Sequence, residues 1–167
     1  MSEHDIKKDT WIKELVTKQQ RNNLVQGLDR LCEVLYQTDQ SWEVKLNQCL
    51  SENQRDLLIK LLQEQEIKFD DLNSIEKALI QMKIYALNLP ILTLYLAIDL
   101  PIKHLFGIAN WFEFNIGERV LLDICVDELL LGGAVIYYQG VRRDFSLRSK
   151  YMYYMNQGLI DIDTLLN

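Results

Sequence analysis

The residue types of a hydrolase triad occur in this sequence as Ser146, His104 and Asp144. A catalytic serine of that kind usually lies in a Gly-x-Ser-x-Gly turn that exposes its hydroxyl. Ser146 has no such glycines beside it, and His104 belongs to a separate predicted helix. Acid–base chemistry by Asp127 and Glu128 is also disfavoured, because adjacent residues at a strand end point in different directions. The sequence therefore predicts no catalytic residues and no enzymatic activity.

Spacing also argues against a phosphate site and a metal site. Gly132-Gly133 is a glycine-rich bend, but no Lys-Ser/Thr pair follows it and a strand comes next, so we interpret it as a structural bend. The two histidines lie far apart and no C-x-x-C pair occurs, so we expect no metal and no cofactor. Cys32, Cys49 and Cys125 are interpreted as reduced thiols packed as small apolar side chains.

Composition narrows the class of protein. The chain has 167 residues, 49% of them hydrophobic and 25% charged, with a net charge of −6. This balance supports a folded core, and the negative sign disfavours binding to nucleic acid. The longest nearly uncharged apolar stretch, residues 86–98, is shorter than the roughly 20 residues that a membrane span needs. We therefore expect a soluble protein.

Basic and aromatic residues cluster toward the C-terminus. The cations between residues 142 and 150 are interpreted as a solvated face or as a docking surface for an acidic partner. Asp144 lies four residues before Arg148, a spacing that allows an ion pair worth at most about 1 kcal/mol if exposed. The aromatic run 151–155 cannot all be buried on one helix, so half of it is expected in the core and half against a partner. The residues expected at a partner interface are Arg142, Arg143, Tyr151 and Tyr154.

Apolar periodicity predicts a helical N-terminal domain over residues 1–88. One helix face is marked by leucines at steps of four, three and four, namely Leu24, Leu28, Leu31 and Leu35. Ser41 is expected to cap a second helix, and Ser51 with Gln54 has the form of a capping box at the start of a third. A fourth helix is expected to begin at residues 70–71. Together these helices predict a small antiparallel bundle.

The character of the sequence changes at Pro90. Residues 91–98 are apolar at nearly every position, which predicts a central strand buried on both faces. Pro101 is suited to the first turn of a helix, which we expect to end near Gly117. This strand–helix pair begins the second domain.

The remaining elements complete an α+β protein, a helical bundle followed by a small β-α-β-β-α domain. The later elements are expected in this order: strands at residues 120–126 and 134–138, a Gln139-Gly140 turn, a short edge strand at residues 141–144 and a helix capped by Ser146. The second domain is assigned to residues 89–156. Residues 157–167 are assigned to a tail that we expect to dock, because its residues 159–163 are more apolar than a free terminus requires.

The stretch from Val126 to Arg148 resembles the signature of the delta subunit of bacterial F-type ATP synthases, the relative of the mitochondrial oligomycin-sensitivity-conferring protein. In that family a strand ends in Val-Asp, a Leu lies two residues before Gly-Gly, and Asp-x-Ser-hydrophobic-Arg begins the last helix. The matching positions are Val126, Asp127, Leu130, Gly132, Gly133, Gly140, Asp144, Ser146, Leu147 and Arg148. The resemblance covers roughly residues 91–155. Glu128 replaces the family's usual proline, and residues 1–88 lack the Arg-Tyr-Ala segment of many delta subunits.

The resemblance implies a mechanical function. Delta subunits belong to the peripheral stalk, the stator that clamps the catalytic head so that the proton-driven rotor can drive ATP synthesis. The helical domain would bind the N-terminal segments of the alpha subunits, and the second domain would bind the C-terminal end of subunit b. The protein would then lie at the cytoplasmic face of the inner membrane, peripheral to it through the complex. The competing hypotheses are an adaptor that reuses the fold and a small enzyme that uses Ser146.

Overall fold

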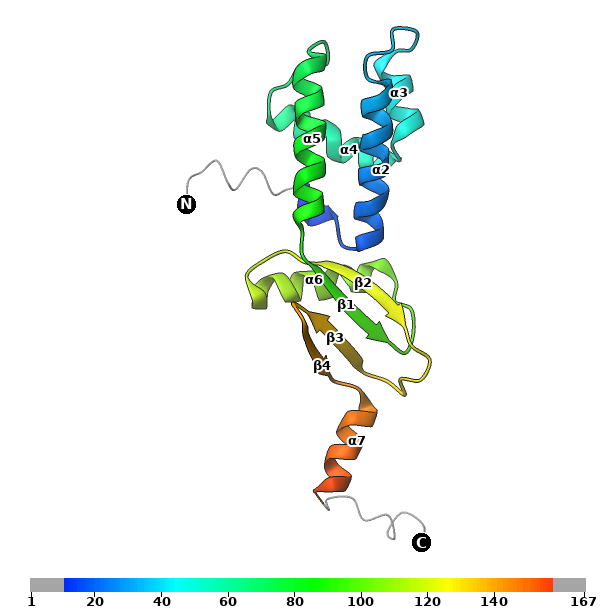
Figure 1. Ribbon diagram of the computed structural model, residues 1–167, viewed down its shortest axis with the longest axis vertical. Coiled ribbons are helices and arrows are strands. Elements are labelled where there is room, and N and C mark those ends of the chain that lie inside the picture. The colour runs from blue at the N-terminus through cyan, green and yellow to red at the C-terminus, as the bar shows by residue number, and fades with distance from the viewer. Residues whose placement is uncertain (1–10, 158–167) are drawn as a thin grey trace. The chain divides into compact units, whose positions relative to one another are not determined.

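The computed structural model describes residues 11–157, which divide into two compact units that meet between Pro90 and Ile91 (Figure 1). We call them the helical unit and the sheet unit. The described part of the first contains helices, and the second combines helices with a four-stranded sheet. The chain is thus a mixed helix-and-sheet protein with the helices first, as predicted. No described helix combines the length and apolar character that a membrane crossing requires.

The helical unit is built around two long neighbouring helices. Its elements are the short 3-10 helix η1 (Ile12–Glu14), then α2 (Lys18–Val34), α3 (Trp42–Cys49), α4 (Glu52–Glu64) and α5 (Leu72–Asn88). Helices α2 and α5 lie side by side and run in opposite directions, and α3 packs against α2 (Figure 1). The four leucines of the predicted stripe are all buried in this unit. Each contributes about 1.5–3 kcal/mol by leaving water.

The helix starts follow the capping residues of the sequence, with one exception. The side-chain oxygen Oε1 of Gln54 accepts the N–H of Ser51 at 2.9 Å, as the capping-box prediction requires. Asp71 accepts the N–H of Ser74 at 3.1 Å and thereby caps α5. Helix α3 begins directly after Ser41, but the Ser41 side chain makes no capping hydrogen bond. The predicted helix order is therefore confirmed, while the cap expected at Ser41 is not.

Two residues fix how closely α2 meets its neighbours. Lys45 is 5% exposed, and its ammonium Nζ donates to the carbonyl oxygens of Leu35 at 2.8 Å and Gln37 at 2.5 Å. These carbonyls follow the end of α2, where the helix dipole favours a positive charge. Gly27 lies against the turn between α3 and α4, and a Cβ there would be 2.6 Å from Leu50 Cδ2. A larger residue at position 27 would push these segments apart.

The sheet unit contains the three strands of the predicted β-α-β-β-α scheme together with the edge strand predicted at residues 141–144. Its elements are β1 (Ile91–Leu96), α6 (Ile102–Ile116), β2 (Leu121–Val126), β3 (Ala134–Tyr138), β4 (Val141–Asp144) and α7 (Leu147–Asn156). The sheet order is β2-β1-β3-β4, in which β1 is parallel to β2 and antiparallel to β3, and β3 is antiparallel to β4. The predicted edge strand is β4, which pairs with β3 along its whole length.

The prediction that β1 is buried on both faces is wrong. Burial alternates along β1, so the residues on one face are buried and those on the other are only partly buried. The covered face holds Leu92, Leu94 and Leu96, and the open face holds Ile91, Thr93 and Tyr95. Helix α6 joins β1 to β2 and supplies the buried Leu105, Ala109 and Phe112. A single crossover helix covers one face of a sheet, which is why the second face of this central strand is only partly buried.

Candidate functional site

The glycine pair of the signature forms a tight junction with the start of α7. Gly132 and Gly133 have φ angles of 146° and 79°. The carbonyl of Gly132 accepts the N–H of Leu147 at 3.0 Å, and the carbonyl of Ala134 accepts the N–H of Phe145 at 2.8 Å. A Cβ on Gly133 would lie 2.4 Å from the Phe145 carbonyl oxygen. Glycine is required here because two backbone segments touch, which agrees with the predicted structural bend.

Asp144 and Ser146 complete this junction. Asp144 Oδ1 accepts the N–H of Ser146 at 3.0 Å, and Asp144 Oδ2 pairs with the Arg142 guanidinium at 3.0 Å. Hydrogen bonds from Ser146, together with the charge of Arg142, hold the pKa of the Asp144 carboxyl below its ordinary value. The predicted pair between Asp144 and Arg148 is wrong. Arg142 and Asp144 are two residues apart and so share one face of β4, whereas Arg148 lies in α7 with its side chain exposed.

Ser146 is a helix cap. Its side chain is 2% exposed, and its hydroxyl oxygen accepts the N–H of Ser149 at 3.2 Å at the start of α7, as predicted. A nucleophilic serine needs an accessible hydroxyl beside a general base. The hypothesis of an enzyme that uses Ser146 therefore lacks an accessible nucleophile.

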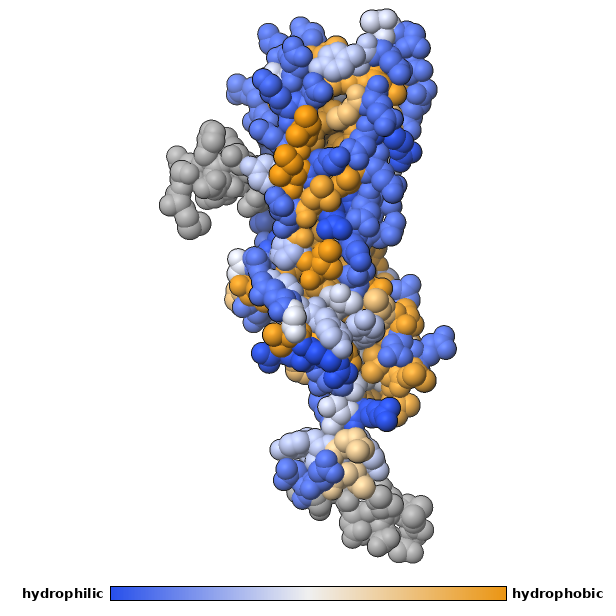
Figure 2. All heavy atoms as spheres, in the orientation of Figure 1, coloured by the Kyte–Doolittle hydropathy of each residue, from blue (hydrophilic) through white to orange (hydrophobic). Residues whose placement is uncertain are grey.

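Asp127 organises the turn after β2. Its carbonyl oxygen accepts the N–H of Leu130 and its carboxylate accepts the N–H of Leu129, both at 3.0 Å, as predicted for an aspartate in a turn. The turn holds Leu129 and Leu131 outward, with 83% and 80% of each residue exposed. They join other exposed apolar residues at the carboxyl ends of β1 and β2 (Figure 2). We call this surface the strand-end patch, and its members are Ile98, Val126, Leu129 and Leu131.

The basic residues of β4 do not form one patch. Arg142 stands over the ring of Tyr137 at 5.9 Å from its centroid, and Tyr137 meets Tyr95 edge-on with centroids 5.6 Å apart. This group lies on the open face of the sheet. Arg143 is paired in register with Ile136 and therefore points to the opposite face. Strand alternation thus separates the two arginines that we had predicted to share a partner interface.

Helix α7 has no buried residue. Tyr151 and Tyr154 are 47% and 45% exposed, and Met152 and Tyr153 are more exposed still. The prediction that half of this aromatic run packs in the core is wrong, because no neighbouring element covers the helix within the described residues. Contact between Tyr151, Tyr154 and a partner stays a prediction. The tail, which we expected to dock, lies outside the described residues from residue 158 onward.

An apolar groove of about 320 Å³ runs between α2 and α5. Ile80, Ile84 and Leu87 line it from α5 and are 46%, 52% and 47% exposed. Their spacing of four and three residues places them on one face of the helix. Figure 2 shows an apolar stripe along the helical unit with hydrophilic residues on both sides. Sequence reasoning missed this groove, although the i, i+4, i+7 spacing was readable beside the inward-facing stripe of α5.

The edges of the groove carry fixed charges. Lys83 of α5 pairs with Asp29 of α2 at 2.5 Å, and the hydroxyl of Tyr36 donates to Glu76 Oε2 at 2.7 Å. Cys32 lies in the groove lining, and burial, followed by the nearby Asp29 and Glu76 carboxylates, raises the pKa of its thiol. The groove lining contains the carboxylates of Asp29 and Glu76 but only the ammonium of Lys83, so its net charge is negative. The groove is therefore suited to an apolar segment with basic neighbours.

No protein-family model matches the sequence, and no curated protein is detectably similar to it. Within residues 11–157, no three His, Cys, Asp or Glu side chains form a group that could hold a metal ion.

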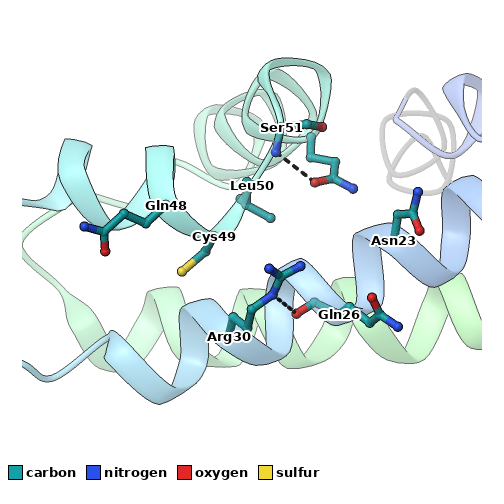
Figure 3. Close-up of a pocket in the computed structure, with 8 residues that line it drawn as sticks. Asn23, Gln26, Arg30, Gln48, Cys49, Leu50 and Ser51 are labelled. Carbon is teal, nitrogen blue, oxygen red and sulfur yellow. Dashed lines mark hydrogen bonds between the residues drawn. The ribbon is translucent and has the colours of Figure 1, made fainter.

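A second hollow, of about 380 Å³, is polar and lies where α2 meets the turn between α3 and α4 (Figure 3). Its lining residues are Asn23, Gln26, Arg30, Gln48, Cys49, Leu50, Ser51 and Gln54. Arg30 donates to the carbonyl of Gln26 at 3.3 Å, and burial raises the pKa of the Cys49 thiol. The side-chain amides and the Cys49 thiol of this lining can form hydrogen bonds. They do not provide the nucleophile and adjacent base that covalent catalysis needs. We interpret this hollow as part of the helix-capping arrangement.

The stability of the sheet unit is expected to fall in alkali because of Tyr138. Partial burial and a hydrogen bond to Glu118 raise its pKa from 10.0 to about 12. A phenol that stays protonated in the folded state stabilises that state below the unfolded pKa, and the contribution disappears as the pH rises through the folded pKa. We expect stability to decline between about pH 10 and pH 12. Urea unfolding across this window, with Tyr138→Phe as the control, measures the effect, and equal slopes in both proteins would contradict it.

Proposed function

We propose that this chain is a non-catalytic clamp that holds two protein partners, and that it serves as the delta-type peripheral-stalk subunit of an F-type ATP synthase. The observation that carries the proposal is the apolar groove between α2 and α5. Three half-exposed apolar side chains along one helix are costly to leave in water unless a partner covers them. The resemblance of residues 126–148 to the delta signature supplies the identity of the complex.

The size of the groove fits a short helix. From Glu76 to Leu87 its lining spans 11 residue steps of α5, which corresponds to about 16 Å or three helical turns. An amphipathic helix would lay its own apolar stripe against Ile80, Ile84 and Leu87, in the helix-in-groove mode of recognition. In the proposed complex this helix belongs to the N-terminal segment of an alpha subunit. The acidic lining favours a segment with Lys or Arg beside its apolar stripe.

The strand-end patch supplies the second surface. It lies in the sheet unit, and two of its leucines are about four-fifths exposed. In the proposed complex it contributes to binding the C-terminal end of subunit b. Separate surfaces on separate units are what a linking subunit needs, since each partner can then be held without displacing the other. We propose that the order of the two units along the chain corresponds to the delta pattern, an antiparallel helical bundle followed by a small α/β domain.

The mechanical role follows from these contacts. A rotor can perform work on the catalytic head only when the head is prevented from turning with it. The clamp must therefore dissociate slowly, and slow dissociation comes from buried apolar contacts rather than from exposed ion pairs. No bond is made or broken by this subunit. In this proposal it lies at the cytoplasmic face of the inner membrane and contributes to ATP synthesis through proton transport by the whole complex.

Co-purification tests the proposal with groove variants of the tagged full-length protein, expressed in its own cells. Wild type should recover the alpha, beta and b subunits in stoichiometric amounts. Ile84→Asp places a charge in the groove and should lower the recovery of alpha at least about tenfold, while b is retained. Val44→Asp is the matched control, because Val44 is 42% exposed on α3 and is absent from the groove lining.

Two results would count against this assignment. Equal recovery of alpha by the Ile84→Asp and Val44→Asp variants would show that the groove is not the alpha-binding surface. Clean purification of the wild type without any synthase subunit would favour an adaptor that uses the same two surfaces elsewhere. A gene located between those of subunits b and alpha would favour the synthase. Deletion of residues 91–167 should abolish binding to b, and unchanged binding would remove the second contact from the proposal.

A further inference from the structure

Helix α6 has a glycine that the fold itself does not require. Gly107 lies in the middle of the helix with its backbone exposed, and a Cβ built on it would meet no atom within 4 Å. Glycine in a helix interior costs about 1 kcal/mol relative to alanine. Close packing inside the chain does not explain this cost at Gly107, in contrast to Gly27 and Gly133.

Large aromatic side chains stand beside this glycine on the outer face of α6. Trp111 is 59% exposed and Phe114 is 88% exposed, which is unusual for such large apolar residues. His104, Gly107, Trp111 and Phe114 follow one another at steps of three, four and three, the spacing of a coiled-coil seam. The opposite face of the helix holds the buried residues that cover the sheet. Helix α6 therefore has a second apolar seam.

We propose that this seam pairs with the α6 seam of a second copy of the chain, with the two helices antiparallel about a twofold axis. Positions 104 and 114 are equally far from Ala109 in the sequence, and so are positions 107 and 111. In an antiparallel pair centred on Ala109, each of these positions in one copy therefore faces its counterpart in the other copy. Gly107 of one copy then faces Trp111 of the other, and His104 faces Phe114. Trp111 of each copy enters the space above Gly107 of the other copy. The contact therefore occurs twice, as an isologous interface requires.

Charges around the seam are compatible with this pairing. The carboxylate of Glu113 is bound to Arg119 at 3.0 Å, and the amide of Asn110 accepts from the same arginine at 2.9 Å. Lys103 lies in the first turn of α6, where the dipole of its own helix disfavours a cation. In the antiparallel pair Lys103 comes beside the carbonyl end of the other helix, near Gly117, where a cation is favoured. The second copy is thus complementary in both shape and charge.

The expected dimer is weak. Two short helices bury less surface than the roughly 800 Å² per partner of a stable complex. We therefore expect a dissociation constant of about 10 µM to 1 mM, so that the protein is monomeric at high dilution. This inference does not depend on the proposed clamp function, because the seam and the groove lie on different units.

Sedimentation analysis of the full chain tests the pairing across that concentration range. Wild type should shift toward the mass of a dimer as its concentration rises. Gly107→Gln fills the notch and should weaken association at least about tenfold, while raising the thermal midpoint because the helix gains a better helix former. Trp111→Ser should weaken association similarly. Ile102→Ser, at an exposed position of α6 outside the seam, and Val44→Asp, at an exposed position of α3, should associate like wild type.

Opposite outcomes would overturn the proposal. Monomeric wild type up to about 1 mM would exclude the dimer. A Gly107→Gln protein that dimerises like wild type would show that the notch takes no part, even if association itself is real. A folded Gly107→Gln or Trp111→Ser monomer that has lost binding to another protein, with wild type also monomeric, would assign the seam to a different partner.

Discussion

Replacing Gly133 with alanine is expected to destabilise the sheet unit by about 2–5 kcal/mol. The new Cβ would lie 2.4 Å from the carbonyl oxygen of Phe145 and 2.9 Å from Cα of Ser146. Both are backbone atoms, so no rotamer change can relieve the contact, and forced overpacking costs about 1–3 kcal/mol. A left-handed backbone with φ of 79° adds about 1–2 kcal/mol for any residue with a Cβ. The strand β3 and the start of α7 would have to separate.

Gly140 provides the matched control for this variant. Its φ of 78° is nearly the same, but a Cβ there would meet no atom within 4 Å. Gly140→Ala should therefore cost only the backbone strain of about 1–2 kcal/mol. Amide hydrogen exchange of the full-length protein, resolved residue by residue, separates the two units. Protection should fall strongly across β1 to β4 in Gly133→Ala and persist in α2. Equal losses in both variants would mean that the junction contact contributes nothing.

Lys45→Met is expected to destabilise the helical unit by about 2 kcal/mol. Methionine preserves most of the buried aliphatic volume but removes the ammonium that Leu35 and Gln37 share. Hydrogen bonds from a charged donor contribute about 1.5–3 kcal/mol, and a buried carbonyl left without a donor costs a similar amount. Part of this loss is offset because the buried charge no longer has to be desolvated. The net effect should appear as a lower urea midpoint with an unchanged slope.

An exposed lysine serves as the comparison for Lys45. Lys60 forms an ion pair with Glu14 at 2.6 Å, and both side chains are nearly half exposed. Lys60→Met should change stability by less than about 1 kcal/mol, because exposed pairs contribute little. The two variants make the same substitution, so their difference compares a buried ammonium bound to two carbonyls with an exposed ammonium bound to one carboxylate. A Lys45→Met protein as stable as wild type would show that desolvation of the ammonium cancels its hydrogen bonds.

Local patterns determined the elements of this protein. The leucine spacing in residues 24–35 and the Ser51–Gln54 box predicted helices that the structure contains, because helix periodicity and capping depend on neighbours within one or two turns. The Gln139-Gly140 turn and the Ser146 cap are equally local, and both occur as predicted. Asp127 accepts hydrogen bonds from the turn that it begins, which its residue type already favoured.

The conformation of each strand and the packing of whole elements decided the features relevant to function. Burial of β1 on one face depends on how many helices return to the sheet, which the apolar run at residues 91–98 does not encode. Asp144 pairs with Arg142 and not with Arg148. Side chains two residues apart on the strand β4 lie on the same face, whereas Arg148 lies in α7. The same alternation separated Arg142 from Arg143.

The sequence by itself determined the order of the main helices and strands, that the Gly132-Gly133 bend is structural, and which family signature the chain resembles. Only the tertiary structure decided that Ile80, Ile84 and Leu87 line a groove instead of a core. It also decided that, within residues 11–157, no element covers α7, and that Lys45 of α3 binds the carbonyls at the end of α2. Periodicity reports which side chains share a face of an element. Which faces remain open depends on the packing of whole elements, and those contacts join residues far apart in the chain.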